Sequence, residues 1–85
     1  MAELQQQAAK QAIINFRYKK SDIISSKSRD DKRIEHLLDS MLDFCFDDDV
    51  LLAYKTLLRY YYHIDPESVA FYVRQYWKMY EEEAE

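Results

Sequence analysis

Residues 34–45 have the sequence Ile34-Glu35-His36-Leu37-Leu38-Asp39-Ser40-Met41-Leu42-Asp43-Phe44-Cys45. Apolar residues recur there at intervals of three and four, which is the spacing of one face of an α-helix. That face carries Ile34, Leu37, Leu38, Met41, Leu42 and Cys45. The opposite face is acidic, with Glu35, Asp39 and Asp43. The segment therefore predicts an amphipathic helix packed against a core.

The 85-residue chain contains no glycine and a single proline. Tight β-hairpins depend on glycine because their turns require a positive φ angle. The phosphate-binding loops of nucleotide enzymes, the EF-hand loop and the nucleophile elbow of hydrolases also contain glycine at fixed positions. The composition therefore excludes these motifs and predicts an all-α protein.

The same apolar spacing continues on both sides of the opening segment. It predicts a compact bundle of four helices over about 2–20, 30–46, 48–62 and 66–82, joined by short connections. The polar, serine-rich residues 21–29 are expected to form a connection, with Ile23 or Ile24 reaching the core. Residues 1–85 are expected to form one helical domain that ends in an acidic, frayed tail over residues 81–85.

Three boundaries have recognisable capping residues. Ser28, followed three residues later by Asp31, resembles a capping box in front of the second helix. The run 47–49 consists of three aspartates, which favour the start of the third helix because carboxylates accept hydrogen bonds from free backbone N–H groups. Asp65 is expected to be the N-cap of the last helix, with Pro66 as its first residue.

Charge is distributed unevenly along the chain. Residues 1–33 hold eight Lys or Arg against four Asp or Glu, whereas residues 34–85 hold four against twelve. This asymmetry is compatible with two surfaces for different partners, with contact between the two ends in a self-assembly, or with the mixed charge of an ordinary soluble domain. No apolar run is long enough to span a membrane, and Cys45 is the only cysteine. We expect a cytoplasmic protein in which Cys45 is buried.

The residues that could carry chemistry are few, and each has a structural explanation. His36 and Asp39 could share a metal ion, but they fit a solvated helix face better. His63 precedes a tight turn and is expected there because histidine tolerates positive φ. The aspartates at 47–49 lack the alternation and the glycine of a calcium loop. We therefore expect no enzyme activity, no metal, no cofactor and no small-molecule substrate.

Aromatic residues are concentrated in the C-terminal half. Tyr60, Tyr61 and Tyr62 are consecutive, so they spread around a helix and cannot all face one core. Tyrosine and tryptophan are favoured at protein interfaces. The sequence thus predicts an interface, for a homodimer or another protein, that includes Tyr60, Tyr62, Phe71, Tyr76, Trp77, Met79 and Tyr80. The alternative is that a small core simply uses aromatic residues to bury area.

Residues 57–73 resemble the helix-turn-helix of bacterial transcriptional regulators. The positions that fit are Ile64, Pro66, Ser68, Val69, Tyr72 and Val73, while His63 stands in place of the usual turn glycine and Asp65 is the cap. The resemblance implies DNA binding by the last helix. The residues that it places toward DNA are Arg59, Phe71, Arg74, Gln75 and Lys78. The acidity of residues 34–85 opposes this, unless the basic residues of 17–33 lie beside that helix.

These observations favour a non-enzymatic accessory or regulatory protein that acts through helix-face protein contacts and self-associates. DNA binding as a helix-turn-helix regulator is the alternative. A third possibility is an acidic inhibitor or antitoxin-type protein that binds a basic partner, as the net charge of −4 allows.

Overall fold

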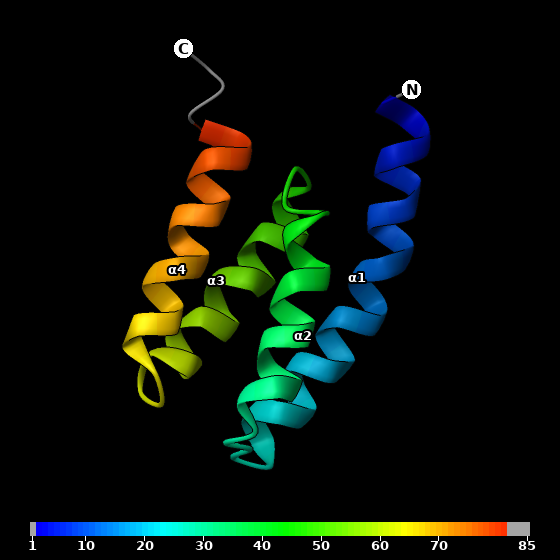
Figure 1. Ribbon diagram of the computed structural model, residues 1–85. Coiled ribbons are helices and arrows are strands. Elements are labelled where there is room, and N and C mark those ends of the chain that lie inside the picture. The colour runs from blue at the N-terminus through cyan, green and yellow to red at the C-terminus, as the bar shows by residue number, and fades with distance from the viewer. Residues whose placement is uncertain (1, 82–85) are drawn as a thin grey trace.

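The structure is a computed structural model that describes the backbone of residues 2–81 and the side chains of residues 8–81. It contains helices α1 (Ala2–Ser25), α2 (Asp31–Leu42), α3 (Asp48–Tyr62) and α4 (Pro66–Tyr76). A π-helical turn, η1 (Trp77–Glu81), continues α4 (Figure 1). The described residues contain no strand, and the predicted all-α bundle of four helices is confirmed.

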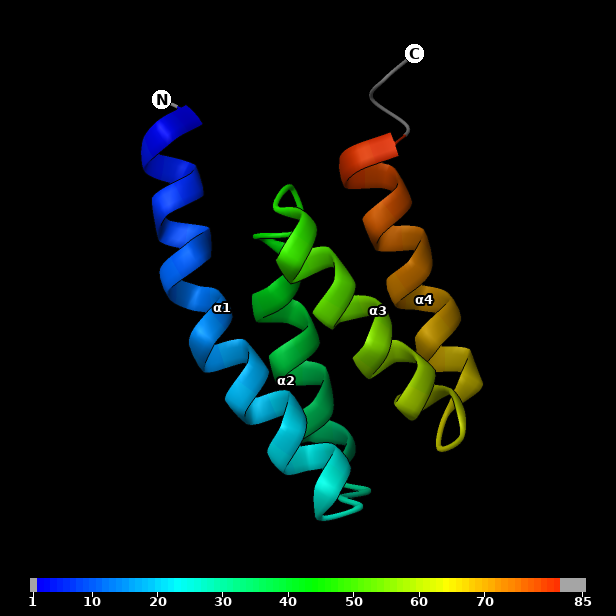
Figure 2. The same cartoon turned by 180° about the vertical axis from the view of Figure 1, so that it is seen from behind.

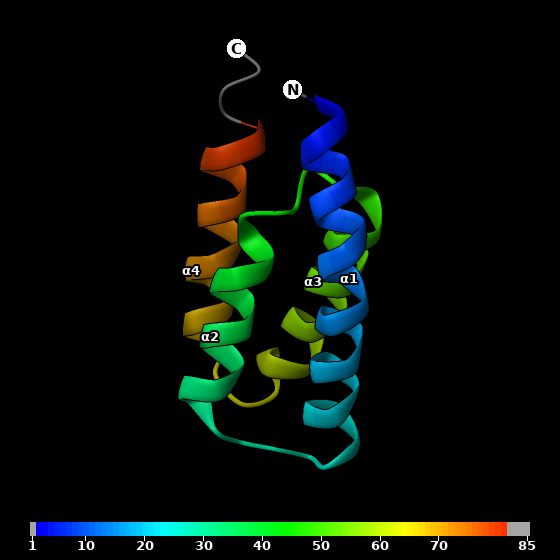
Figure 3. The ribbon, with the colours of Figure 1, turned by 90° about the vertical axis from the view of Figure 1, so that its right-hand side faces the viewer.

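Successive helices run in opposite directions (Figure 1). Seen from the side, α2 and α4 form one layer while α1 and α3 form the other (Figure 3). Helix α3 is central because it packs against each of the other three helices. Seen from behind, α1 and α4 lie at opposite edges of the molecule, with α3 beside α4 (Figure 2).

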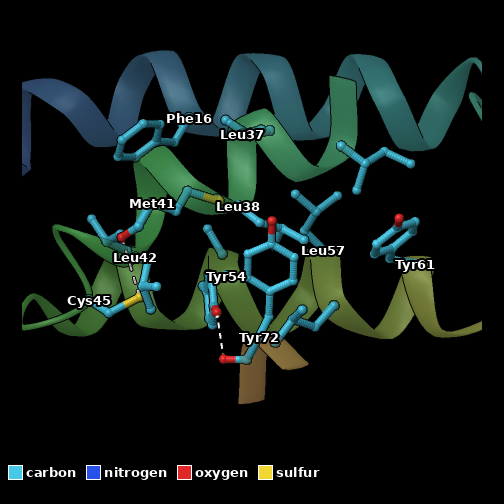
Figure 4. Packing of buried hydrophobic residues seen from close by; sticks show 14 of the residues in the cluster. Phe16, Leu37, Leu38, Met41, Leu42, Cys45, Tyr54, Leu57, Tyr61 and Tyr72 are labelled. Carbon is cyan, nitrogen blue, oxygen red and sulfur yellow. Dashed lines mark hydrogen bonds between the residues drawn. The ribbon is translucent and has the colours of Figure 1, made fainter. Parts of the chain in front are cut away.

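A single core fills the space between the helices. Its fully buried side chains include Ile34, Leu38, Met41, Leu57 and the two tyrosines Tyr54 and Tyr61. The hydroxyl of Tyr54 donates to the backbone carbonyl of Tyr72, 3.0 Å away, so its polar end is satisfied inside the core (Figure 4). Cys45 is 3% exposed, as expected from the sequence.

Two of the predicted helix starts are found in the structure. The side chain of Asp47 accepts hydrogen bonds from the backbone N–H groups of Asp49 and Val50 at the start of α3. Asp65 caps α4 in the same way through Ser68, with Pro66 in the first turn. Hydrogen bonds from Ser68 hold the pKa of the Asp65 carboxyl below its usual value of 3.8.

The connection between the first two helices is shorter than predicted. Helix α1 continues to Ser25, so residues 26–30 rather than 21–29 form the connection. Ile23 is 1% exposed, so its side chain is part of the core. The longer helix is consistent with this burial, because helices in proteins are stabilised mainly by the packing of their apolar face. The capping box at Ser28 is wrong: Asp30 is the N-cap of α2, and the Ser28 hydroxyl accepts a hydrogen bond from the Asp30 N–H.

The other helix ends also differ from the expected ones. Helix α2 ends at Leu42 instead of residue 46, because residues 43–46 form turns in which Phe44 N–H bonds to the carbonyl of Met41. His63 has φ −72°, so the positive φ expected there is wrong. Among residues 2–81 a positive φ is found at Lys27 instead. The predicted frayed tail, 81–85, lies outside the described residues apart from Glu81.

Candidate protein-interaction face

Three of the seven predicted interface residues take part in the internal packing. Tyr60 donates its hydroxyl to the Ser28 carbonyl at 2.6 Å, and Tyr80 donates to the Leu42 carbonyl at 2.6 Å. The ring of Tyr76 stacks on Tyr80, with ring centroids 5.2 Å apart. Burial raises the pKa of both Tyr76 and Tyr80. These side chains hold the bundle together and offer little surface to a partner.

The other four predicted residues, Tyr62, Phe71, Trp77 and Met79, are exposed. They do not form one patch. Phe71 and Met79 lie eight residues apart on the flank of α4 and η1 next to Tyr72, whose hydroxyl reaches the Glu35 carbonyl of α2. Tyr62 and Trp77 lie on the opposite flank, toward α3.

A hollow of about 470 Å³ separates α3 from α4 on that flank. Leu58 and Val69 form its apolar floor, since they are only 7% and 9% exposed. Tyr62 and Val73 line its sides and are each at least half exposed. Its remaining lining residues are basic or titratable: Lys55, Arg59 and His63. The hollow therefore has an apolar base and a cationic rim.

The apolar surface continues beyond the hollow toward the start of α3 and the end of α4. Tyr54 packs against Tyr76, with ring centroids 6.5 Å apart, so the early part of α3 lies beside the late part of α4. Leu52 and Trp77, both more than half exposed, lie toward this end. We define the α3–α4 face by the exposed residues Leu52, Lys55, Arg59, Tyr62, Val73 and Trp77.

Two of the four Lys and Arg residues of the acidic region 34–85 lie on the α3–α4 face. Lys55 and Arg59 are on α3, one turn apart, and both line the hollow. Arg74 and Lys78, also one turn apart, are exposed on α4 and η1, three and seven residues after Phe71, and share its side of the helix. The face is thus a local exception in a strongly acidic region.

Three of the six residues of this face were predicted from the sequence to lie at an interaction surface. Tyr62 and Trp77 were expected at a protein interface and Arg59 at DNA, so they were divided between two different hypotheses. The sequence pattern did not identify the other three, Leu52, Lys55 and Val73, as surface residues. The spacing of Leu52, Lys55, Arg59 and Tyr62 could have predicted that they lie on the same side of α3, because residues three and four apart share one side of a helix.

Four of the five residues expected at DNA share one side of α4 and η1, because they follow one another at intervals of three and four: Phe71, Arg74, Gln75 and Lys78. Arg59 lies apart from these four, on α3, where it lines the α3–α4 hollow. The basic segment 17–33 belongs to α1, the following connection and the start of α2. It lines a second hollow of about 640 Å³ between α1 and α2, with Lys19, Lys32 and Arg33 at its rim.

The described residues offer few groups for chemistry. Among residues 8–81, no three His, Cys, Asp or Glu side chains are placed to hold a metal ion. Burial raises the pKa of the Cys45 thiol from 9.0 to about 12, with a smaller contribution from the nearby charge of Asp43. A thiol with this pKa is a poor nucleophile near neutral pH. In the part of the chain described, no helix is both long and apolar enough to cross a membrane.

No protein-family model, no curated protein and no solved structure matches this chain. The class that the fold defines is a small all-α four-helix protein.

Proposed function

We propose that this chain is a non-enzymatic accessory or regulatory protein that binds another protein through the α3–α4 face. The observation that carries the proposal is the exposure of Tyr62 and Val73 at a hollow with an apolar floor, with the exposed Leu52 and Trp77 beyond its end. Exposed apolar groups that gather in one place on a small protein mark interaction sites, and Trp, Tyr and Arg supply much of the binding energy at interfaces. The single free cysteine, Cys45, suits a reducing compartment such as the cytoplasm.

The aromatic composition also suggested self-association, which is one form of this proposal. In that form a second copy would cover the face. In the alternative form a different protein covers the face.

Site-specific photo-crosslinking in cells tests the proposal. A benzophenone amino acid is placed at position 62 or 73 on the face, and at the exposed position 25 at the end of α1 as a matched control. We expect discrete protein adducts from positions 62 and 73 that are absent from position 25. Equal adducts at all three positions, or none at positions 62 and 73, would contradict the proposal.

Nucleic acid is a second candidate for the same face. The exposure of Lys55 and Arg59 on α3, and of Arg74 and Lys78 on α4 and η1, favours it, because phosphate contacts supply most of the affinity for DNA. The surrounding acidity and the apolar side chains favour a protein instead. A salt titration of duplex DNA binding tests the second candidate, with Arg74→Ala and Lys78→Ala as variants. Binding that does not change in these variants would exclude recognition by α4.

A further inference from the structure

We infer that the occupant of the α3–α4 face is an acidic amphipathic helix of a different protein. This inference rests on the proposed function and specifies the chemistry of the partner. It follows from the shape of the hollow, its length, the charge at its rim and the symmetry that self-association would require.

The shape of the face suits a helix. Two antiparallel helices form its sides, and the apolar floor of Leu58 and Val69 runs between them. An amphipathic helix binds in such a groove by placing apolar residues at positions i, i+3 or i+4, and i+7 into it. An added β-strand would need an unpaired sheet edge, and residues 2–81 contain no strand.

The length of the face defines the size of the partner segment. From Leu52 to Tyr62 helix α3 advances about 15 Å, at 1.5 Å per residue. A partner helix of about three turns covers this distance. Its apolar residues would then contact Leu52 and Trp77 at one end, the floor in the middle, and Tyr62 at the other end.

The rim determines the charge of the partner. Lys55 and Arg59 line the hollow from α3, and no Asp or Glu is among its lining residues. Carboxylates that flank the apolar stripe of a partner helix would lie opposite these cations. Complementary charges of this kind increase the association rate and exclude partners of the wrong sign.

The same charges disfavour a symmetric dimer through this face. A two-fold dimer brings the same patch of both copies together, so the cationic rim formed by Lys55 and Arg59 would be present on both sides of the interface. Like charges placed opposite one another are unfavourable. A distinct acidic partner removes this repulsion.

The first experiment uses a synthetic helical peptide of 14 residues, with Leu at positions 1, 5, 8 and 12 and Glu on both flanks. Trp77 is the only tryptophan, so its fluorescence reports binding at the face directly. Two control peptides have the same length: one has its leucines distributed around the helix, and one has Lys in place of Glu. We expect saturable binding of the first peptide, and at least tenfold weaker binding of both controls.

Matched protein variants then locate the site. The double variant Lys55→Glu and Arg59→Glu reverses two charges on the face. The control, Lys19→Glu and Lys32→Glu, makes the same change in net charge on the distant α1–α2 side. All four side chains are exposed, and circular dichroism verifies that each variant stays folded. We expect at least a tenfold loss of peptide affinity in the first variant and less than a twofold change in the control.

Other outcomes would overturn the inference. Equal binding of the acidic and basic peptides, or equal losses in both double variants, would exclude specific recognition of an acidic helix. Tighter binding of duplex DNA than of the acidic peptide would identify nucleic acid as the occupant. Crosslinks between two copies at positions 62 and 73, without peptide binding, would identify a second copy and would leave the proposed function intact. If neither peptide binding nor crosslinking is observed, both the inferred acidic partner and the proposed function are contradicted.

Discussion

Tyrosine hydroxyls make most of the side-chain hydrogen bonds that join different helices in the part of the chain that the structure describes. Tyr54 donates to the backbone carbonyl of Tyr72 in α4, and Tyr72 and Tyr80 donate to backbone carbonyls of α2. Tyr61 donates to the carboxylate of Glu35 at 2.6 Å. Among the described residues, no buried side-chain nitrogen or oxygen lacks a hydrogen-bond partner. The rings thus supply buried area while their hydroxyls remain paired.

Removal of one such hydroxyl should cost measurable stability. We expect Tyr54→Phe to lower the free energy of unfolding by about 0.5–1.5 kcal/mol, because a buried hydrogen bond is lost. Urea unfolding followed by circular dichroism measures the difference. Tyr62→Phe is the matched control: its side chain is 57% exposed, and we expect its unfolding free energy to match that of the parent. Equal effects of the two substitutions would show that the hydroxyl of Tyr54 does not contribute in this way.

At the scale of the element, the end of α1 shows how a chain without glycine completes a helix. Lys27 has φ 55°, its N–H bonds to the Ile24 carbonyl, and the Ser28 N–H bonds to the Ile23 carbonyl. This is the Schellman arrangement, in which the left-handed position is usually glycine. A lysine in that conformation is strained because its Cβ approaches the following carbonyl.

The strain at Lys27 leads to a prediction of increased stability. Lys27→Gly should raise the free energy of unfolding by up to about 1 kcal/mol, since relief of the left-handed strain exceeds the added entropy of the unfolded chain. Thermal unfolding compares this variant with Lys27→Ala, which keeps a Cβ and should show no gain. A loss of stability in the glycine variant would contradict the assignment of strain to this residue.

The accuracy of the sequence-based predictions differed from element to element for physical reasons. The starts of α3 and α4 were predictable because Asp47, Asp65 and Pro66 act through local backbone geometry. The end of α1 was not, because serine-rich residues read as a connection while the burial of Ile23 favoured helix. The division of the tyrosines into core and surface depends on which helices meet. Nothing local to Tyr80 indicates that its hydroxyl reaches Leu42.

At the scale of the whole molecule, the buried ionisable groups limit stability at alkaline pH. Burial raises the pKa of Tyr54, Tyr61 and Tyr72 above the ordinary value of 10.0, and that of Cys45 from 9.0 to about 12. Above pH 9 the folded protein therefore binds more protons than the unfolded chain does. By linkage, the free energy of unfolding falls as pH rises through this range.

We accordingly expect that the contribution of these groups to stability is fully present below pH 9 and is lost progressively above it. Each buried tyrosine or cysteine that is protonated in the folded protein but ionised in the unfolded chain lowers the free energy of unfolding by up to about 1.4 kcal/mol per pH unit. Urea unfolding at pH 7, 9 and 10.5 measures the trend. Tyrosinate absorbance at 295 nm should show buried tyrosines ionising together with the loss of helix. Unchanged stability from pH 7 to pH 10.5 would contradict the prediction.

The central position of α3 has a consequence for local opening of the native state. Helices α1, α2 and α3 pack against one another, whereas α4 packs mainly on α3 and is tied to α2 by the hydroxyls of Tyr72 and Tyr80. Helix α4 can thus detach while the other three remain closed, but α3 cannot. Amide hydrogen exchange should be slowest in α3 and faster in α4. A partner that spans the α3–α4 face would fasten α4 to α3, and would slow exchange there more than anywhere else in the chain.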